Sequence, residues 1–205
     1  RRLMLLVPML LAGSAMAADI SIRADDWAPY NGNPASDHPG YMIEAARLIA
    51  ERSGHRVDYA QLSWEEALAA TRTGAIDCVV GAFKGDAPDF RFPEASWGRA
   101  NDAFYVLSDN PWRYAAVADL ASQRVARIAG YDYSDDVVEY FKTAAPDKVV
   151  LIDNTRNGLS KALMLLVTRR VDVVVETENV VTAKLRSMGL VAQVQTLVPK
   201  RSLTD

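Results

Sequence analysis

The sequence predicts an α/β protein of two similar lobes, each a mostly parallel sheet flanked by helices, joined by a two-strand hinge. Strand-like and helix-like segments alternate along the chain, as they do in proteins that cover a parallel sheet with helices. A helix leading through an Ile-Asp or Val-Asp pair into an apolar strand occurs twice, with an offset of 95 residues. Two such units can also resemble each other by chance, because both follow one apolar pattern.

The first lobe is predicted over residues 18–108. It opens with a strand at residues 20–24, where apolar and polar side chains alternate. A loop rich in Pro, Gly and Asn follows over residues 29–40. A helix is predicted over residues 41–53, because apolar side chains recur at helical spacing and Gly54 then ends the run.

The rest of the first lobe continues this alternation. A short strand is expected near residues 56–61. The segment Ser63-Trp64-Glu65-Glu66 has the pattern of a capping box, which opens a helix that Gly74 then ends. An apolar strand is expected over residues 76–82, and residues 104–107 are expected to form a strand that leaves the lobe.

The second lobe is predicted over residues 109–193, after a break at Asn110-Pro111-Trp112. The expected elements are strands at 125–129, 149–152 and 171–175 and helices at 136–142 and 159–167. A strand at residues 191–198 is expected to return toward the first lobe, to which residues 194–205 are assigned. Because the sequence stops in a polar stretch, we expect this last part of the lobe to be incomplete.

Residues 1–17 have the layout of a secretory signal peptide. Two arginines precede an apolar run from Leu3 to Leu11, and Ala15-Met16-Ala17 supplies the small residues that signal peptidase requires. We expect cleavage between Ala17 and Ala18 and a location outside the cytoplasm. The alternative is an uncleaved membrane anchor, for which the apolar run is short.

Charge and cysteine content exclude several classes of function. Removal of residues 1–17 changes the formal net charge from −3 to −5, which argues against nucleic acid or an anionic membrane surface as a partner. The single cysteine, Cys78, cannot form an internal disulfide. His38 and His55 do not have metal-ligand spacing with it, so neither a metal site nor another cofactor is expected.

Four segments together resemble the extracellular solute-binding proteins of the polar amino acid ABC-transporter type, bacterial family 3. These segments are Ala24-Asp25-Asp26-Trp27-Ala28-Pro29-Tyr30, Gly40-Tyr41-Met42-Ile43-Glu44, Gly74-Ala75-Ile76-Asp77 and Arg170-Val171-Asp172-Val173-Val174-Val175-Glu176. The resemblance implies a periplasmic binding protein type II fold. It also implies a monomeric periplasmic protein, without catalysis, that closes on a small polar solute, an amino acid or a related compound. The protein would then dock on the membrane permease of an ABC importer.

One departure from the family concerns the ligand. After the third strand, family members have a Thr-x-x-Arg segment whose arginine holds the ligand carboxylate, but here Gly81 is followed by residues without arginine at that place. Arg91 or Lys84 could supply the charge, although a lysine does not provide the two-pronged donor of an arginine.

The predicted ligand-binding residues are Trp27, Tyr30, Phe83, Lys84, Arg91, Tyr133, Ser134 and Glu176. Trp27 and Tyr30 follow the end of a strand, where open α/β sheets bind ligands, but they could instead cover the core. The segment with Tyr133 and Ser134 opens a helix, and the resemblance implies that it takes the ligand carboxylate, although Ser134 could simply cap that helix. The resemblance also implies that Glu176 binds the amino group of the ligand.

Two other functions stay open. The same scaffold could serve as a cleft enzyme such as a dehydratase, with Glu176 and Asp86 as its acids, although no Ser-His-Asp, Cys-His or phosphate-loop motif supports catalysis. It could also serve as a ligand-sensing module. Asp77 and Asp172, which recur in the two lobes, are expected to act in turns or caps rather than in chemistry.

Overall fold

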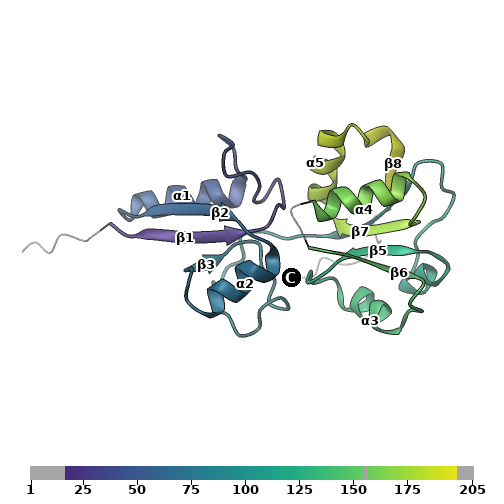
Figure 1. Ribbon diagram of the computed structural model, residues 1–205, viewed down its shortest axis with the longest axis horizontal. Helices are drawn as coiled ribbons and strands as arrows, with labels where there is room; N and C mark the ends of the chain where they lie inside the picture. The colour runs from purple at the N-terminus through teal and green to yellow at the C-terminus, as the bar shows by residue number, and fades with distance from the viewer. Residues whose placement is uncertain (1–16, 155–156, 198–205) are drawn as a thin grey trace, which may run out of the picture.

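The computed structural model describes residues 17–154 and 157–197 and consists of two α/β lobes, each built on its own sheet (Figure 1). Of the predicted signal peptide, all but Ala17 lies outside the described residues. Within those residues, no helix is both long enough and apolar enough to cross a membrane.

The first lobe has a parallel three-stranded sheet in the order β2-β1-β3. Its strands are β1 (Asp19–Ala24), β2 (Arg56–Gln61) and β3 (Cys78–Val79), and its helices are α1 (Tyr41–Arg52) and α2 (Trp64–Arg72). The capping box is formed as predicted, with the Ser63 hydroxyl accepting from the Glu66 N–H at 3.3 Å. Strand β3 is much shorter than the predicted span 76–82 because only residues 78 and 79 pair with β1.

The second lobe has a five-stranded sheet in the order β6-β5-β7-β4-β8. Its strands are β4 (Asp102–Leu107), β5 (Val125–Ile128), β6 (Val149–Ile152), β7 (Val173–Thr177) and β8 (Val194–Leu197). Its helices are α3 (Asp135–Thr143), α4 (Gly158–Val167) and α5 (Glu178–Met188), with 3-10 turns at Val117–Ser122 and Val191–Gln193. Helices α4 and α5 cover one face and α3 the other (Figure 1).

Alternating side chains on β5 and β7 separate the two core layers of this lobe. Ala126 and Val174 pack into the layer under α4 and α5, whereas Val125, Val173 and Val175 pack into the layer under α3. A strand buried on both faces is continuously apolar, and this explains the run of valines in β7.

The repeated aspartates do the same work in both lobes. Asp77 accepts the Ser21 backbone N–H at 2.8 Å, and Asp172 accepts the Arg124 backbone N–H at 2.8 Å. Each aspartate directly precedes a strand, β3 or β7, and its carboxylate ties the start of that strand to the neighbouring strand, β1 or β5. The shared role supports the interpretation of the two lobes as a structural repeat.

Two strands lie in a different place from the one predicted. Residues 102–107, assigned to the end of the first lobe, pair with β7 and β8 in the second sheet. Residues 194–197, expected to return toward the first lobe, pair with β4 at the edge of the same sheet. The open edge of β4 offers unpaired backbone groups that β8 satisfies, so the chain stays in the second lobe through residue 197.

Candidate ligand-binding site

A cavity with a free volume of ≈ 30 Å³ lies between the two lobes. The first lobe contributes Asp25, Trp27, Asn31, Trp64, Val80, Gly81, Phe83 and Asp86, and the second contributes Asp102, Tyr131, Asp132, Tyr133, Glu176 and Thr177. Most of these residues follow the carboxyl ends of β1, β3, β5 and β7, which is where open α/β sheets bind ligands. A space of this size holds about two water molecules. It opens onto a much larger groove, with which it shares seven lining residues.

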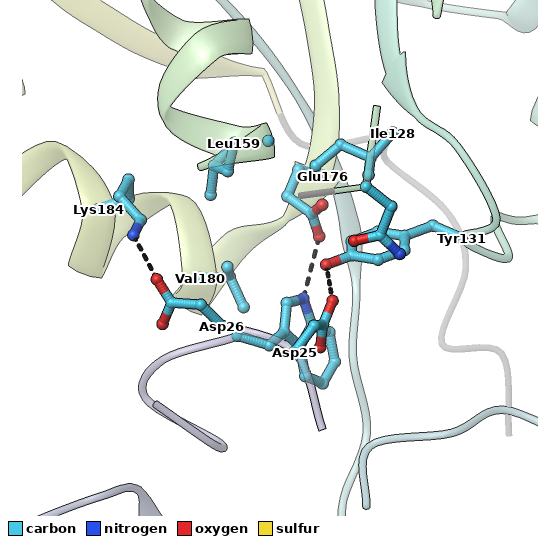
Figure 2. Close-up of a pocket in the computed structure, with 11 residues that line it drawn as sticks. Asp25, Asp26, Ile128, Tyr131, Leu159, Glu176, Val180 and Lys184 are labelled. Atoms are coloured by element: carbon cyan, nitrogen blue, oxygen red, sulfur yellow. Dashed lines mark hydrogen bonds and ion pairs between the residues drawn. The ribbon is translucent and has the colours of Figure 1, made fainter. Parts of the chain in front are cut away.

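Polar contacts join the lobes beside this cavity (Figure 2). The Trp27 indole donates to Glu176 Oε1 at 3.3 Å, and the Tyr131 hydroxyl donates to the Asp25 carboxylate. Lys184 forms an ion pair with Asp26 at 2.9 Å. Each contact joins the loop after β1 to the second lobe, so this loop bridges the two lobes.

Glu176 is the most deeply buried acid of the site. Glu176 is the next-to-last residue of β7 and is 3% exposed, and its Oε1 accepts the Thr177 backbone N–H at 2.7 Å. The second oxygen, Oε2, has no hydrogen-bond partner among the described residues. Burial raises the pKa of Glu176 to about 7, although the bonds from Thr177 and Trp27 act in the opposite direction.

Three further acids of the cavity are also shifted. Burial raises the pKa of Asp25 to about 6, and it raises the pKa of Asp86 to about 6. Burial also raises the pKa of Asp102. Several carboxyl groups thus share a poorly solvated space, and each would be stabilised in its charged form by a nearby cation. Among the described residues, no group of three or more His, Cys, Asp or Glu is arranged to hold a metal ion.

Asn31 closes the first-lobe wall of the cavity. It is fully buried, and its Nδ2 donates to the Asp25 backbone carbonyl at 3.0 Å. Its Oδ1 has no partner among the described residues. Gly81 lies beside it with φ +88°, and a Cβ at that position would come within 3.2 Å of Asn31 Oδ1 and 3.5 Å of the Trp27 ring. A glycine is therefore required by both the backbone conformation and the close approach.

The loop before α3 is satisfied by the protein's own acids. The Ser134 N–H donates to Asp102 Oδ2 at 3.0 Å, and the Tyr133 N–H donates to Asp132 Oδ1 at 3.1 Å. The Tyr133 hydroxyl accepts the Ile128 N–H at 2.9 Å, at the end of β5. The backbone donors predicted to form an anion site are thus already bound to carboxylates.

The structure brings together four of the eight predicted site residues. Trp27, Phe83, Tyr133 and Glu176 line the cavity. Tyr30 stacks on Trp27 with ring centroids 4.5 Å apart, and its hydroxyl accepts a hydrogen bond from Asn179 Nδ2. It therefore holds the indole in place without lining the cavity itself. The others, which are Lys84, Arg91 and Ser134, do not line the cavity but line a larger groove that borders it.

Sequence reasoning missed several residues of the cavity. Asn31, Trp64 and Asp102 were not among the predictions, although they line it from three different segments. Asp25 stood in a quoted motif directly after β1, and its place at a strand end was a usable signal. Asp102 had none, because its role depends on the pairing of β4 with β7.

The two α/β lobes have the periplasmic binding protein type II fold. Residues 20–87 match the family of bacterial extracellular solute-binding proteins, family 3, which confirms the predicted resemblance for that part of the chain. No curated protein is significantly similar in sequence.

Solved structures of this fold match nearly the whole chain. An ancestral arginine-binding protein bound to glutamine is 24% identical with a TM-score of 0.70, covering 91% of this chain and 81% of that one. A substrate-binding protein of an ABC uptake transporter from Streptococcus pneumoniae with bound histidine is 16% identical, with a TM-score of 0.73 and coverages of 90% and 76%. A histidine kinase sensor domain is 23% identical, with a TM-score of 0.70 and coverages of 89% and 78%. These likenesses confirm the predicted fold class.

Proposed function

We propose that this chain is the solute-binding component of an ABC importer, which captures a small polar solute between its lobes and delivers it to a membrane permease. The observation that carries the proposal is a cavity lined by both lobes, at the sheet ends where ligands bind. A ligand that contacts both walls stabilises the closed arrangement, and a permease can recognise that arrangement.

The comparisons support an amino acid or a related small polar compound as the solute. One similar structure is an arginine-binding protein bound to glutamine, and another carries histidine. The family match covers the first-lobe wall from β1 to Ala87, which includes Trp27, Gly81 and Asp86.

Binding is favoured over catalysis. Asp86 and Glu176 do line the same cavity, as a cleft enzyme would require. However, the described residues that line it include no Ser, Cys or His that could act as a nucleophile or a base beside them. The family match also describes binding proteins.

The test is a ligand panel with two readouts. Purified protein is mixed with amino acids, organic amines and small organic acids, and its melting temperature and small-angle scattering are measured. A true ligand raises the melting temperature by several degrees and makes the molecule more compact. If no compound of the panel changes either quantity, the protein is not a solute-binding component.

Export belongs to the same proposal. We propose a periplasmic monomer that begins at Ala18 after removal of the signal peptide. Intact mass spectrometry of the periplasmic fraction should give a chain starting at Ala18, and light scattering should give the mass of one copy. A chain that retains Arg1 and sediments with membranes would contradict this part.

A further inference from the structure

We propose that the cavity between the lobes binds a small organic cation that carries no carboxylate, such as a protonated alkyl amine or diamine, in preference to α-amino acids. This inference rests on the proposed function and narrows its ligand class. It depends on four features of the site: its charge, its free hydrogen-bonding atoms, its occupied anion position and its aromatic walls.

The charged groups on the cavity wall are all acidic. Among the described lining residues, the ionisable groups that are charged at neutral pH when solvated are Asp25, Asp86, Asp102, Asp132 and Glu176, and no Lys, Arg or His is present. Burying several carboxylates together is unfavourable unless a positive charge joins them. The cavity therefore favours a cation.

The free polar atoms of the wall are acceptors. Glu176 Oε2 and Asn31 Oδ1 have no partner among the described residues, and both residues are more than nine-tenths buried. The bond from Asn31 Nδ2 to the Asp25 carbonyl fixes which end of that amide faces the cavity. An ammonium group has three donors and no acceptor, so it can satisfy both oxygens, whereas a carboxylate can satisfy neither.

The position that would hold a ligand carboxylate is already taken. Asp102 Oδ2 accepts the Ser134 N–H at 3.0 Å, at the first residue before α3. Asp132 accepts the Tyr133 N–H at 3.1 Å. A ligand carboxylate placed there would have to displace Asp102 and would then lie beside its negative charge.

The basic residues around the cavity do not line it. Lys184 is held by Asp26 beside an adjacent pocket whose free volume of ≈ 10 Å³ is that of about one water molecule. Asn154 in that pocket has a free Nδ2, but it carries no charge. Arg127 lies over the Phe141 ring at 4.9 Å, and Lys84 and Arg91 line the larger groove that borders the cavity.

Aromatic rings complete the cavity. Trp27, Trp64, Phe83, Tyr131 and Tyr133 line it, and the Trp27 and Phe83 rings meet edge to face at 6.3 Å. The negative face of an aromatic ring attracts a desolvated cation. The acids and rings together therefore suit a charged amine. No arginine in the described part of the chain lines the cavity to hold a carboxylate.

The test uses pairs of compounds that differ only by a carboxylate. Isothermal titration calorimetry at pH 7.5 compares 1,4-diaminobutane with ornithine, 1,5-diaminopentane with lysine, agmatine with arginine, and histamine with histidine. We expect at least one amine to bind 100-fold or more tightly than its amino acid. If the amino acid of each pair binds as well as or better than the amine, this inference is wrong, while the solute-binding function stands. If no amine, amino acid or organic acid binds, both are wrong.

Three variants locate the recognition. Glu176→Gln keeps the shape of the side chain and should weaken amine binding 10-fold or more, whereas Glu139→Gln, an exposed acid on α3 whose side chain is 65% exposed, should leave it unchanged. Asp102→Asn should reduce the preference for the amine over its amino acid by 10-fold or more, because it removes the negative charge beside which a ligand carboxylate would lie. Equal amine affinity in all three variants and the parent would overturn the assignment, and circular dichroism verifies that each is folded.

Discussion

At the scale of single residues, the site is controlled by the burial of Glu176. One of its oxygens accepts the Thr177 N–H and the Trp27 indole N–H, and the other has no partner among the described residues. A carboxyl group in this position is easier to bury when protonated, which is why its pKa rises to about 7. Its titration is therefore coupled to both stability and ligand binding.

The pH dependence of stability should reveal this coupling. Between the ordinary pKa of 4.5 and the folded value of about 7, the folded protein binds more protons at Glu176 than the unfolded chain does. The contribution of Glu176 to stability is therefore present below pH 4.5 and is lost as the pH rises to about 7. Urea denaturation should show that the parent protein loses on the order of 2 kcal/mol of its free energy of unfolding between pH 4.5 and 8 through this group. In Glu176→Gln this loss should be absent. If the free energy of unfolding changes with pH equally in the parent protein and in Glu176→Gln, the pKa of Glu176 is not raised by folding.

Binding of an amine should have the opposite pH dependence. A cation needs ionised carboxylates, and burial raises the pKa of both Asp25 and Asp86 to about 6. Affinity should therefore rise at least 10-fold from pH 5 to pH 8, with protons released on binding. Calorimetry in two buffers of different ionisation enthalpy measures this release, and an affinity independent of pH would disprove it.

Gly81 provides a test of the packing around the site. Its φ of +88° strains any other residue, and a Cβ would crowd Asn31 and Trp27. Gly54 has φ +76° with nothing within 4 Å of its Cβ position, so Gly54→Ala carries the backbone cost alone, about 1 kcal/mol. Gly81→Ala should lose about 1 kcal/mol more than this control in denaturant titrations and should weaken ligand binding. Equal losses would show that the wall yields to the added methyl group.

At the scale of elements, the repeated aspartates hold β3 beside β1 and β7 beside β5. Asp172 receives bonds from the Arg124 backbone N–H, Nε and Nη2, at 2.8, 2.8 and 2.7 Å. These bonds lower the pKa of Asp172, so their contribution is present above its ordinary pKa and is lost as the pH falls. The clamp holds β7, and therefore Glu176 at its end, in register with β5.

Removal of the Asp172 carboxylate should destabilise the protein more than removal of an exposed ion pair does. Asp172→Asn should reduce the free energy of unfolding by about 1–2 kcal/mol, because it weakens bonds to a charged partner and to the backbone. Asp109→Asn, which breaks an exposed pair with Arg169, should cost less than about 0.5 kcal/mol. Denaturant titrations above pH 6 compare the two, and a similar loss for both would show that Asp172 has no special role.

At the scale of the whole molecule, closure is the property that matters. The contacts of Asp25, Asp26 and Trp27 with the second lobe hold the walls together, and the pair of Asp26 with Lys184 is the one with full charges. Because both side chains are largely shielded from water, the pair resists screening better than an exposed one. The balance between open and closed forms should respond to it.

Lys184→Gln should therefore shift the molecule toward the open form. We expect a larger radius of gyration in small-angle scattering. We also expect the ligand affinity to fall about 3- to 30-fold, because a smaller fraction of the molecules is in the form that binds ligand. Saturating ligand should restore the compact form. Lys142→Gln, which breaks an exposed pair with Glu139 on α3, is the control. A scattering profile unchanged by Lys184→Gln would show that the ion pair does not govern closure.

Local patterns alone determined much of this protein. Alternation over residues 20–24, the capping box at Ser63 and the 95-residue repeat of the aspartates predicted the two α/β lobes. Trp27 was assigned to the site because it follows the end of a strand, and Glu176 because of the family resemblance, and both line the cavity. Such features depend on neighbours in the sequence, or on the general rule that ligands bind at the strand ends of a sheet.

Tertiary structure alone decided the rest. Asp102 and Asn31 reached the cavity, and Lys84 and Arg91 did not, because strand pairing and loop packing bring together segments that are distant in sequence. Strands β4 and β8 joined the second sheet because backbone hydrogen bonds can be satisfied at any open edge, whichever lobe the sequence pattern suggests. The charge of the cavity, and with it the class of ligand, is a sum over those distant residues and is therefore a property of the folded molecule.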